Sequence, residues 1–196
     1  MGMRRTVVLV AVMAAVLVMA SGVALAVARS GGPGNDILRG TAGPDALEGN
    51  GGNDVLLGYK GNDALSGGKG RDAVLGGNEF RARAGDKALE GGPGGDFVAG
   101  GIGSEAVSGG PGRDFLVDGT FRDDDLDALA GGGGNDAIDV INGPASADAV
   151  DCGRGFDKVL VDSKDVTENC ERVFTSGRAF GNSISNYYFE PLRRIP

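Results

Sequence analysis

The sequence has no histidine and no tryptophan, and aromatic residues make up only 6% of its 196 residues. Without an imidazole base, Ser-His-Asp triads, Cys-His nucleophiles and histidine-ligated zinc proteases are excluded. Hydrolysis by a pair of carboxylates needs no histidine and is not excluded by this absence. With so few large side chains, a compact globule with a thick core is not expected.

Positive charge is also scarce, because 19 lysines and arginines stand against 27 aspartates and glutamates, for a formal net charge of −8. A nucleic-acid partner, which needs clustered lysine and arginine, is therefore not expected. An acidic chain of this kind suits a cation as its partner.

The only long apolar run lies at the amino terminus. Arg4 and Arg5 precede an uncharged segment from Thr6 to Ala20, and the small residues Ala26-Val27-Ala28 come before Arg29. This layout is typical of a secretory signal peptide. We expect residues 1–28 to be removed by cleavage after Ala28 and the protein to be secreted and extracellular. The alternative is an uncleaved membrane anchor.

Glycine is abundant, at 38 residues, and a period of nine residues organises it. The copies read GGPGNDILR, GTAGPDALE, GNGGNDVLL, GYKGNDALS and GGKGRDAVL from Gly31; ARAGDKALE, GGPGGDFVA, GGIGSEAVS and GGPGRDFLV from Ala82; and GGGGNDAID from Gly131. The fourth position is always glycine, the sixth is usually aspartate, and the eighth is always a branched aliphatic residue. Glycine permits a tight turn, and the alternation that follows it predicts a very short strand whose apolar eighth-position side chain is buried. Two nonapeptides then close one coil of about 18 residues.

These blocks resemble the GGxGxDxUx nonapeptide of the RTX (hemolysin-type) family of calcium-binding repeats, over most of residues 31–139. The resemblance implies an all-β fold, a parallel β-roll that is a right-handed β-solenoid. It also implies that aspartate carboxylates and backbone carbonyls of successive turns bind Ca²⁺. The residues agree, because oxygen ligands without histidine or thiolate favour calcium over zinc or copper.

The sixth-position aspartates are the predicted metal ligands. They are Asp36, Asp45, Asp54, Asp63, Asp72, Asp96, Asp114 and Asp136, with Asp127 and Asp157 as weaker positions. Turns on one edge come from alternate repeats, so several calcium ions are expected, at about four strong positions. These positions lie between the pairs Asp36/Asp54, Asp54/Asp72, Asp45/Asp63 and Asp96/Asp114.

Two copies depart from aspartate at the sixth position, with Lys87 in one and Glu105 in the other. They are two repeats apart and fall on the same edge, so either an ion pair replaces a calcium there or the two residues reflect independent drift. The repeat phase slips near residues 76–81 and 118–130. The acidic run Asp123–Asp125 is interpreted as a solvated loop, with a loose cation site as the alternative.

Degenerate repeats and a cap are expected over residues 140–173. The two cysteines, Cys152 and Cys170, are 18 residues apart, which is one coil, so they are predicted to form a disulfide that covers the last sheet edge. Residues 174–196 leave the pattern, and we interpret them as a tail over the end of the roll, with a partner-binding segment as the alternative.

The sequence predicts four regions, namely the signal peptide (1–28), the roll (29–139), the cap (140–173) and the tail (174–196). The function expected is a secreted calcium-binding structural or interaction module that folds with Ca²⁺ and has no enzymatic activity. The alternatives are a secreted hydrolase with a repeat tail and a calcium-dependent surface adhesin, which would have a cell-surface or matrix partner.

Overall fold

The computed structural model describes residues 26–77, 87–119, 125–142 and 146–175, and every regular element in these ranges is a β-strand. Residues 1–25 of the predicted signal segment and residues 176–196 of the predicted tail lie outside the described residues. No helix in the described ranges is long and apolar enough to cross a membrane.

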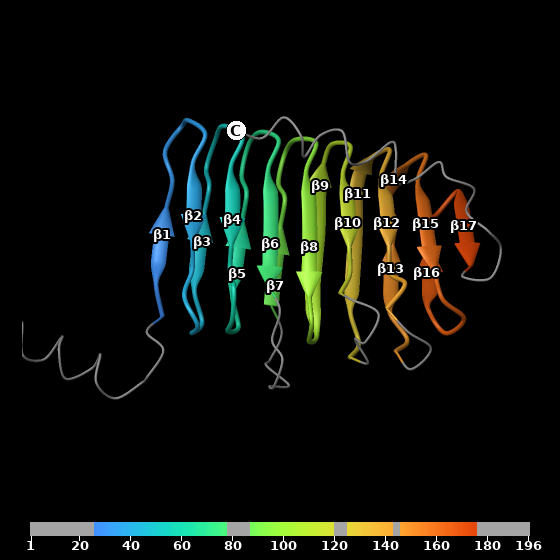
Figure 1. Cartoon of the computed structure of the whole chain (residues 1–196). Coiled ribbons are helices and arrows are strands. Elements are labelled where there is room, and N and C mark those ends of the chain that lie inside the picture. Colours follow the sequence, from blue (N-terminus) through green and yellow to red (C-terminus); the bar gives the residue numbers. More distant parts are fainter. Residues whose placement is uncertain (1–25, 78–86, 120–124, 143–145, 176–196) are drawn as a thin grey trace, which may run out of the picture.

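The strands form two parallel sheets that face each other, as the two rows of arrows in Figure 1 show. Sheet A has the order β1 (Ala28–Ser30), β3 (Ala46–Glu48), β5 (Ala64–Ser66), β7 (Lys87–Glu90), β9 (Glu105–Pro111), β11 (Ala128–Gly134), β13 (Ala149–Asp151) and β16 (Val166–Glu168), and β14 (Arg154–Gly155) also pairs with β11. Sheet B has the order β2 (Ile37–Arg39), β4 (Val55–Leu57), β6 (Ala73–Gly77), β8 (Phe97–Gly101), β10 (Phe115–Val117), β12 (Ala137–Asp139), β15 (Lys158–Val161) and β17 (Arg172–Thr175).

The chain alternates between the two sheets, so each coil of the solenoid contains one strand of each. The all-β parallel roll predicted from the repeat is therefore confirmed. The roll also continues beyond the last clear repeat, because β13, β15, β16 and β17 keep the parallel pairing. Phe174 and Thr175, predicted to begin the tail, instead belong to β17.

The register explains how nine residues become half a coil. Ala46 pairs with Ala64 and Leu47 with Leu65, so equivalent positions stack directly. Where the sequence has extra residues, the register is restored after them: Asp72 stacks on Asp96 at a separation of 24 residues, and Asp114 on Asp136 at 22. The additional residues thus loop out of the roll without disturbing the ladder.

The core is a single layer of aliphatic side chains between the sheets, because the middle residue of most three-residue strands points inward. The eighth-position residues predicted to be buried are confirmed from Leu47 to Ile138, and Leu129, Val150 and Val159 extend the same layer. Leu38, also predicted, is only partly buried because β2 is the end strand of sheet B.

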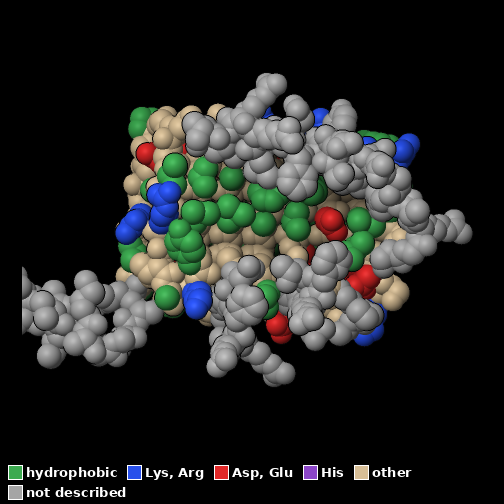
Figure 2. All heavy atoms as spheres, viewed as in Figure 1, with side chains coloured by type: hydrophobic (Ala, Val, Ile, Leu, Met, Phe, Trp, Pro, Cys, Tyr) green, Lys and Arg blue, Asp and Glu red, His purple; other side chains and the backbone are tan. Residues whose placement is uncertain are grey.

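The outer face of sheet B is unusually apolar for an acidic protein. Figure 2 shows rows of hydrophobic side chains across this face. The rings of Phe97 and Phe115, on neighbouring strands β8 and β10, lie 5.6 Å apart between centroids. The outer face of sheet A carries small exposed residues such as Ala46 and acidic ones such as Glu48.

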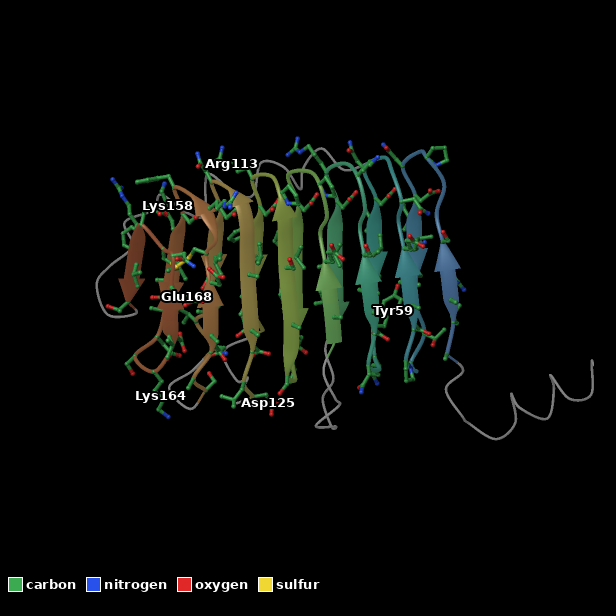
Figure 3. The ribbon with its side chains drawn as sticks, turned by 180° about the vertical axis from the view of Figure 1, so that it is seen from behind. Tyr59, Arg113, Asp125, Lys158, Lys164 and Glu168 are labelled. Carbon is green, nitrogen blue, oxygen red and sulfur yellow. A yellow bond between two sulfur atoms is a disulfide. The ribbon has the colours of Figure 1, made fainter. Side chains whose placement is uncertain are left out.

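The turns between the sheets form two long edges of the roll. The Asp36 edge contains the turns that precede strands of sheet B, and the Asp45 edge contains the turns that precede strands of sheet A. Figure 3 shows both, with Arg113 on the Asp36 edge and Asp125 on the Asp45 edge. The candidate metal ligands lie along these edges.

Candidate metal sites

Aspartates form a continuous ladder along the Asp36 edge. The backbone N–H of Asp36 donates a hydrogen bond of 2.7 Å to Oδ1 of Asp54 in the next coil, and each following aspartate repeats this contact. The members in order are Asp36, Asp54, Asp72, Asp96, Asp114, Asp136 and Asp157. At the end of the ladder, the N–H of Asp157 donates to Oε2 of Glu171 at 2.8 Å. One oxygen of each carboxylate from Asp54 onward is therefore held by backbone, which leaves the other for a different partner.

That second oxygen has no hydrogen-bond donor along most of the ladder. Oδ2 is buried and accepts no hydrogen bond in Asp54, Asp72, Asp96, Asp114, Asp136 and Asp157. These residues are at most 3% exposed. A buried carboxylate oxygen without a donor is costly unless it binds a proton or a cation.

Each open ladder turn has a small space beside its first glycine, which we call the cradle. A side-chain carbon placed on Gly91 would lie 2.7 Å from the carbonyl oxygen of Gly109 and 2.8 Å from Oδ2 of Asp96. One placed on Gly109 would lie 2.7 Å from the carbonyl oxygen of Gly131 and 2.6 Å from Oδ2 of Asp114. A carboxylate oxygen and a carbonyl oxygen from the next coil thus lie close together beside the glycine, and both are oxygen ligands of the kind that calcium takes.

The electrostatics of the ladder favour a cation at that point. Burial, followed by the charges of neighbouring aspartates, raises the pKa of Asp96 to about 7 and that of Asp136 to about 7. Burial likewise raises the pKa of Asp114 to about 6 and raises the pKa of Asp54 and Asp72. Ionising all these carboxylates at neutral pH requires positive charge between them. The residues present fit calcium, because hard oxygen ligands with net negative charge are the ligands that it prefers.

The Asp45 edge begins with the same construction. A side-chain carbon on Gly40 would lie 2.5 Å from Oδ2 of Asp45 and 2.6 Å from the carbonyl oxygen of Gly58. Gly58 is in the same position relative to Asp63 and the carbonyl oxygen of Gly76. The N–H of Asp45 donates to Oδ1 of Asp63 at 2.9 Å, which continues the ladder pattern.

Beyond these two cradles the Asp45 edge changes. Lys87 and Glu105 stand directly opposite each other on β7 and β9, as the nine-residue phase predicts. The side chain of Lys87 lies outside the described part of the chain, so the predicted ion pair stays a prediction. Asp125 lies in the next turn of this edge, whereas Asp123 and Asp124 lie outside the described residues.

Later turns replace the first glycine by a residue with a side chain. On the Asp45 edge, Asp118 and Val140 donate their N–H to the next coil as Gly58 does, and both are buried. On the Asp36 edge, Cys152 takes this position, fully buried, and its N–H donates to the carbonyl oxygen of Glu168. A side chain therefore starts where the cradle lies in earlier turns, so Asp157 has no open cradle like that of Gly131.

The disulfide predicted between Cys152 and Cys170 is confirmed, with a Cα–Cα distance of 5.1 Å. It links the last coils of the roll, as the yellow bond in Figure 3 shows. Reduction would remove this covalent link between the final coils.

The structure stacks all four predicted aspartate pairs, and it also stacks pairs that the sequence analysis missed. Asp72/Asp96, Asp114/Asp136 and Asp136/Asp157 are neighbours although their separations are 24, 22 and 21 residues. Asp127 joins the stack of the Asp45 edge, since its Oδ1 accepts from the N–H of Glu105 and its own N–H donates to Asp148. In each missed pair, the nine-residue repeat resumes with the same pattern after the inserted residues. This resumption could have revealed the pairing from the sequence.

Asp118 was also missed as a site residue, because the phase slip after Val117 hid its place in the repeat. Glu105, Asp118 and Asp127 bring carboxylate oxygens within 4.8 Å of one another, and all three side chains are buried. An alignment that allowed an insertion directly after the first repeat position would have placed Asp118 there.

Comparison with known families agrees with this geometry. The family model for the RTX calcium-binding nonapeptide repeat (4 copies) matches residues 30–65, 48–79 and 84–116. No curated protein matches the chain. The matched segments contain the ladder from Asp36 to Asp114.

Proposed function

Because residues 30–116 carry RTX calcium-binding nonapeptide repeats, we propose that this protein is secreted and folds when it binds calcium. In this proposal the loaded roll acts as a rigid structural or interaction module outside the cell. The ions lie in the cradles, between an aspartate of one turn and a backbone carbonyl of the next coil.

The observation that carries the proposal is the repeated pairing of an unpartnered Oδ2 with a neighbouring carbonyl oxygen. It recurs at Gly49, Gly67, Gly91, Gly109 and Gly131 on the Asp36 edge. A single acidic residue in a turn has many explanations, but the same pair of carboxylate and carbonyl oxygens in coil after coil fits a bound cation. On the other edge Gly58 has the same arrangement, whereas at Gly40 Oδ2 of Asp45 accepts hydrogen bonds from the N–H and the hydroxyl of Thr41.

Calcium-dependent folding follows from the balance between core and charge. The core is one aliphatic layer, whereas the edges bury a row of carboxylates on each side. Without cations, the repulsion between stacked aspartates opposes the limited apolar burial, so the metal-free chain is expected to be expanded.

Calcium titration by calorimetry, with circular dichroism on the same samples, tests this proposal. We expect several ions per chain and a rise in β-content on loading. Asp96→Asn should reduce the stoichiometry, because it removes a cradle carboxylate. Glu48→Gln, which removes an exposed charge from the outer face of sheet A, should leave the stoichiometry unchanged. Equal β-content with calcium and with chelator would refute calcium-dependent folding.

Secretion is proposed from the amino-terminal pattern. The expected cut after Ala28 falls within β1, so the mature chain would keep Arg29 and Ser30 of that strand. Amino-terminal sequencing of exported protein should begin at Arg29, and retention of the first residues would favour a membrane anchor. The apolar outer face of sheet B supports an interaction role, because exposed apolar patches commonly mark contact surfaces.

A further inference from the structure

The turn between β10 and β11 differs from the repeat cradles in the residue at its first position. The N–H of Asp118 donates to the carbonyl oxygen of Asp139 at 2.9 Å, as the N–H of Gly58 does to Leu75 at 2.9 Å. In the turns with glycine, a side chain at this position would project into the cradle. Asp118 therefore places a carboxylate in the space that other turns keep open.

Two further carboxylates reach the same space. Asp127 holds the sixth position of this turn, and Glu105 holds the sixth position of the preceding coil. Oxygens of all three side chains lie within 4.8 Å of one another, and the side chains are 3–4% exposed. Three oxygens at these separations can surround one ion.

Hydrogen bonds fix part of this cluster and leave one oxygen without a donor. Asn142 donates from Nδ2 to Oδ2 of Asp118 at 2.6 Å and to Oδ2 of Asp148 at 2.9 Å. Its own Oδ1 accepts from the hydroxyl of Ser146 at 2.6 Å, which fixes the orientation of the amide. Oδ1 of Asp118 is buried and accepts no hydrogen bond. This oxygen is the second, independent sign of a ligand, beyond the acidic cluster itself.

The local charge favours a cation. Glu105, Asp118 and Asp127 carry three negative charges when all are ionised, and all three residues are buried. A divalent ion between them offsets most of this charge. Burial, with the charges of Asp127 and Asp148, raises the pKa of Asp118 to about 8, which agrees with a strong local excess of negative charge.

We propose that Glu105, Asp118 and Asp127 form a separate site for one hard divalent cation, calcium by preference. The ligand set differs from that of the repeat cradles, because three carboxylates replace one carboxylate and backbone carbonyls. A higher ligand charge binds the ion more tightly. The site lies on the Asp45 edge, where the repeat pattern has lapsed, and its existence does not rest on ion binding in the repeat cradles.

Europium luminescence tests this site in the folded protein. Eu³⁺ substitutes for Ca²⁺, and the energy of its narrow excitation band falls as the negative charge of its ligands rises. At saturating Eu³⁺, the wild-type chain should show a band from the repeat cradles and a second band at lower energy from the three-carboxylate site. Asp118→Asn keeps the shape of the side chain and should abolish the second band.

Asp114→Asn is the matched control, because it removes one charge from a ladder turn that lies four residues away in sequence. It should weaken the cradle band and keep the second band, and circular dichroism would verify that both variants are folded. A single band in the wild-type chain, or a second band that survives Asp118→Asn, would overturn this inference while leaving the proposed function intact. The absence of any bound Eu³⁺ would refute calcium binding by the repeats as well.

Discussion

At the scale of single residues, the first glycine of each turn is important because it has no side chain that could displace the cradle oxygens. Gly91 does not adopt a left-handed backbone conformation, so a substitution there tests space and not backbone strain. The oxygens that surround the space belong to different coils. One side-chain carbon at this position would lie close to both oxygens.

Gly91→Ala should therefore remove one bound calcium and raise the calcium concentration needed for folding. The added carbon would lie 2.7 Å from the carbonyl oxygen of Gly109 and 2.8 Å from Oδ2 of Asp96, so it would displace two of the expected ligand oxygens. Gly133→Ala is the control, because a side-chain carbon there meets nothing within 4 Å. Calorimetry and calcium-dependent circular dichroism measure both effects. If the two variants bound calcium equally well, the cradle would not be the ion site.

At the scale of the element, most strands have three residues and gain stability only by stacking. Most of them contribute one buried side chain to the core and a few backbone hydrogen bonds to their neighbours. The end strands β16 and β17 have a neighbour on one side only, and the residues of β17 are exposed. The disulfide between Cys152 and Cys170 compensates for this weakness, since it ties the last coil to the one before it.

Removing the disulfide in the variant Cys152→Ser/Cys170→Ser should destabilise the carboxy-terminal coils. Closing a loop of 18 residues is worth about 3 kcal/mol through the entropy of the unfolded chain. Hydrogen exchange should show loss of protection in β15, β16 and β17, with β4 to β8 little changed. Uniform loss of protection along the roll would instead show that the coils unfold as one unit.

At the scale of the whole molecule, charge and core are separated. The aliphatic layer runs along the middle of the roll, and carboxylates line its two edges. Folding therefore brings like charges together along the full length of the solenoid. The pH should therefore affect both the stability of the metal-free fold and the affinity of the folded protein for calcium.

In the metal-free protein, folding should improve as the pH falls from about 8 to about 5. The folded pKa values of Asp96, Asp136 and Asp118 lie at about 7, 7 and 8, above the ordinary value of 3.8. The folded state therefore binds more protons than the unfolded state, and its stability is lost as the pH rises through these values. Circular dichroism of calcium-depleted protein across this range measures the effect.

In the folded protein, protons and calcium compete for the same carboxylates. The calcium concentration that half-fills the sites of the folded protein should therefore rise as the pH falls. A metal-free protein whose β-content decreases on acidification would contradict the raised pKa values.

The nine-residue pattern alone was enough to predict the parallel roll, the buried eighth position, the stacked aspartates and the disulfide. A solenoid makes such inference possible because each residue contacts its equivalents in the neighbouring coils, so sequence period translates directly into spatial position. Leu47 and Leu65, or Asp36 and Asp54, needed no long-range information beyond the period.

Only the tertiary structure decided what happens where the period fails. Insertions loop out, so Asp72 stacks on Asp96 and the ladder is continuous, whereas the sequence indicated two separate runs. Asp118 and Cys152 acquire their roles from backbone hydrogen bonds that place them at first-glycine positions. The physical reason is that backbone pairing between strands fixes register regardless of loop length, and register determines which side chains share a cradle.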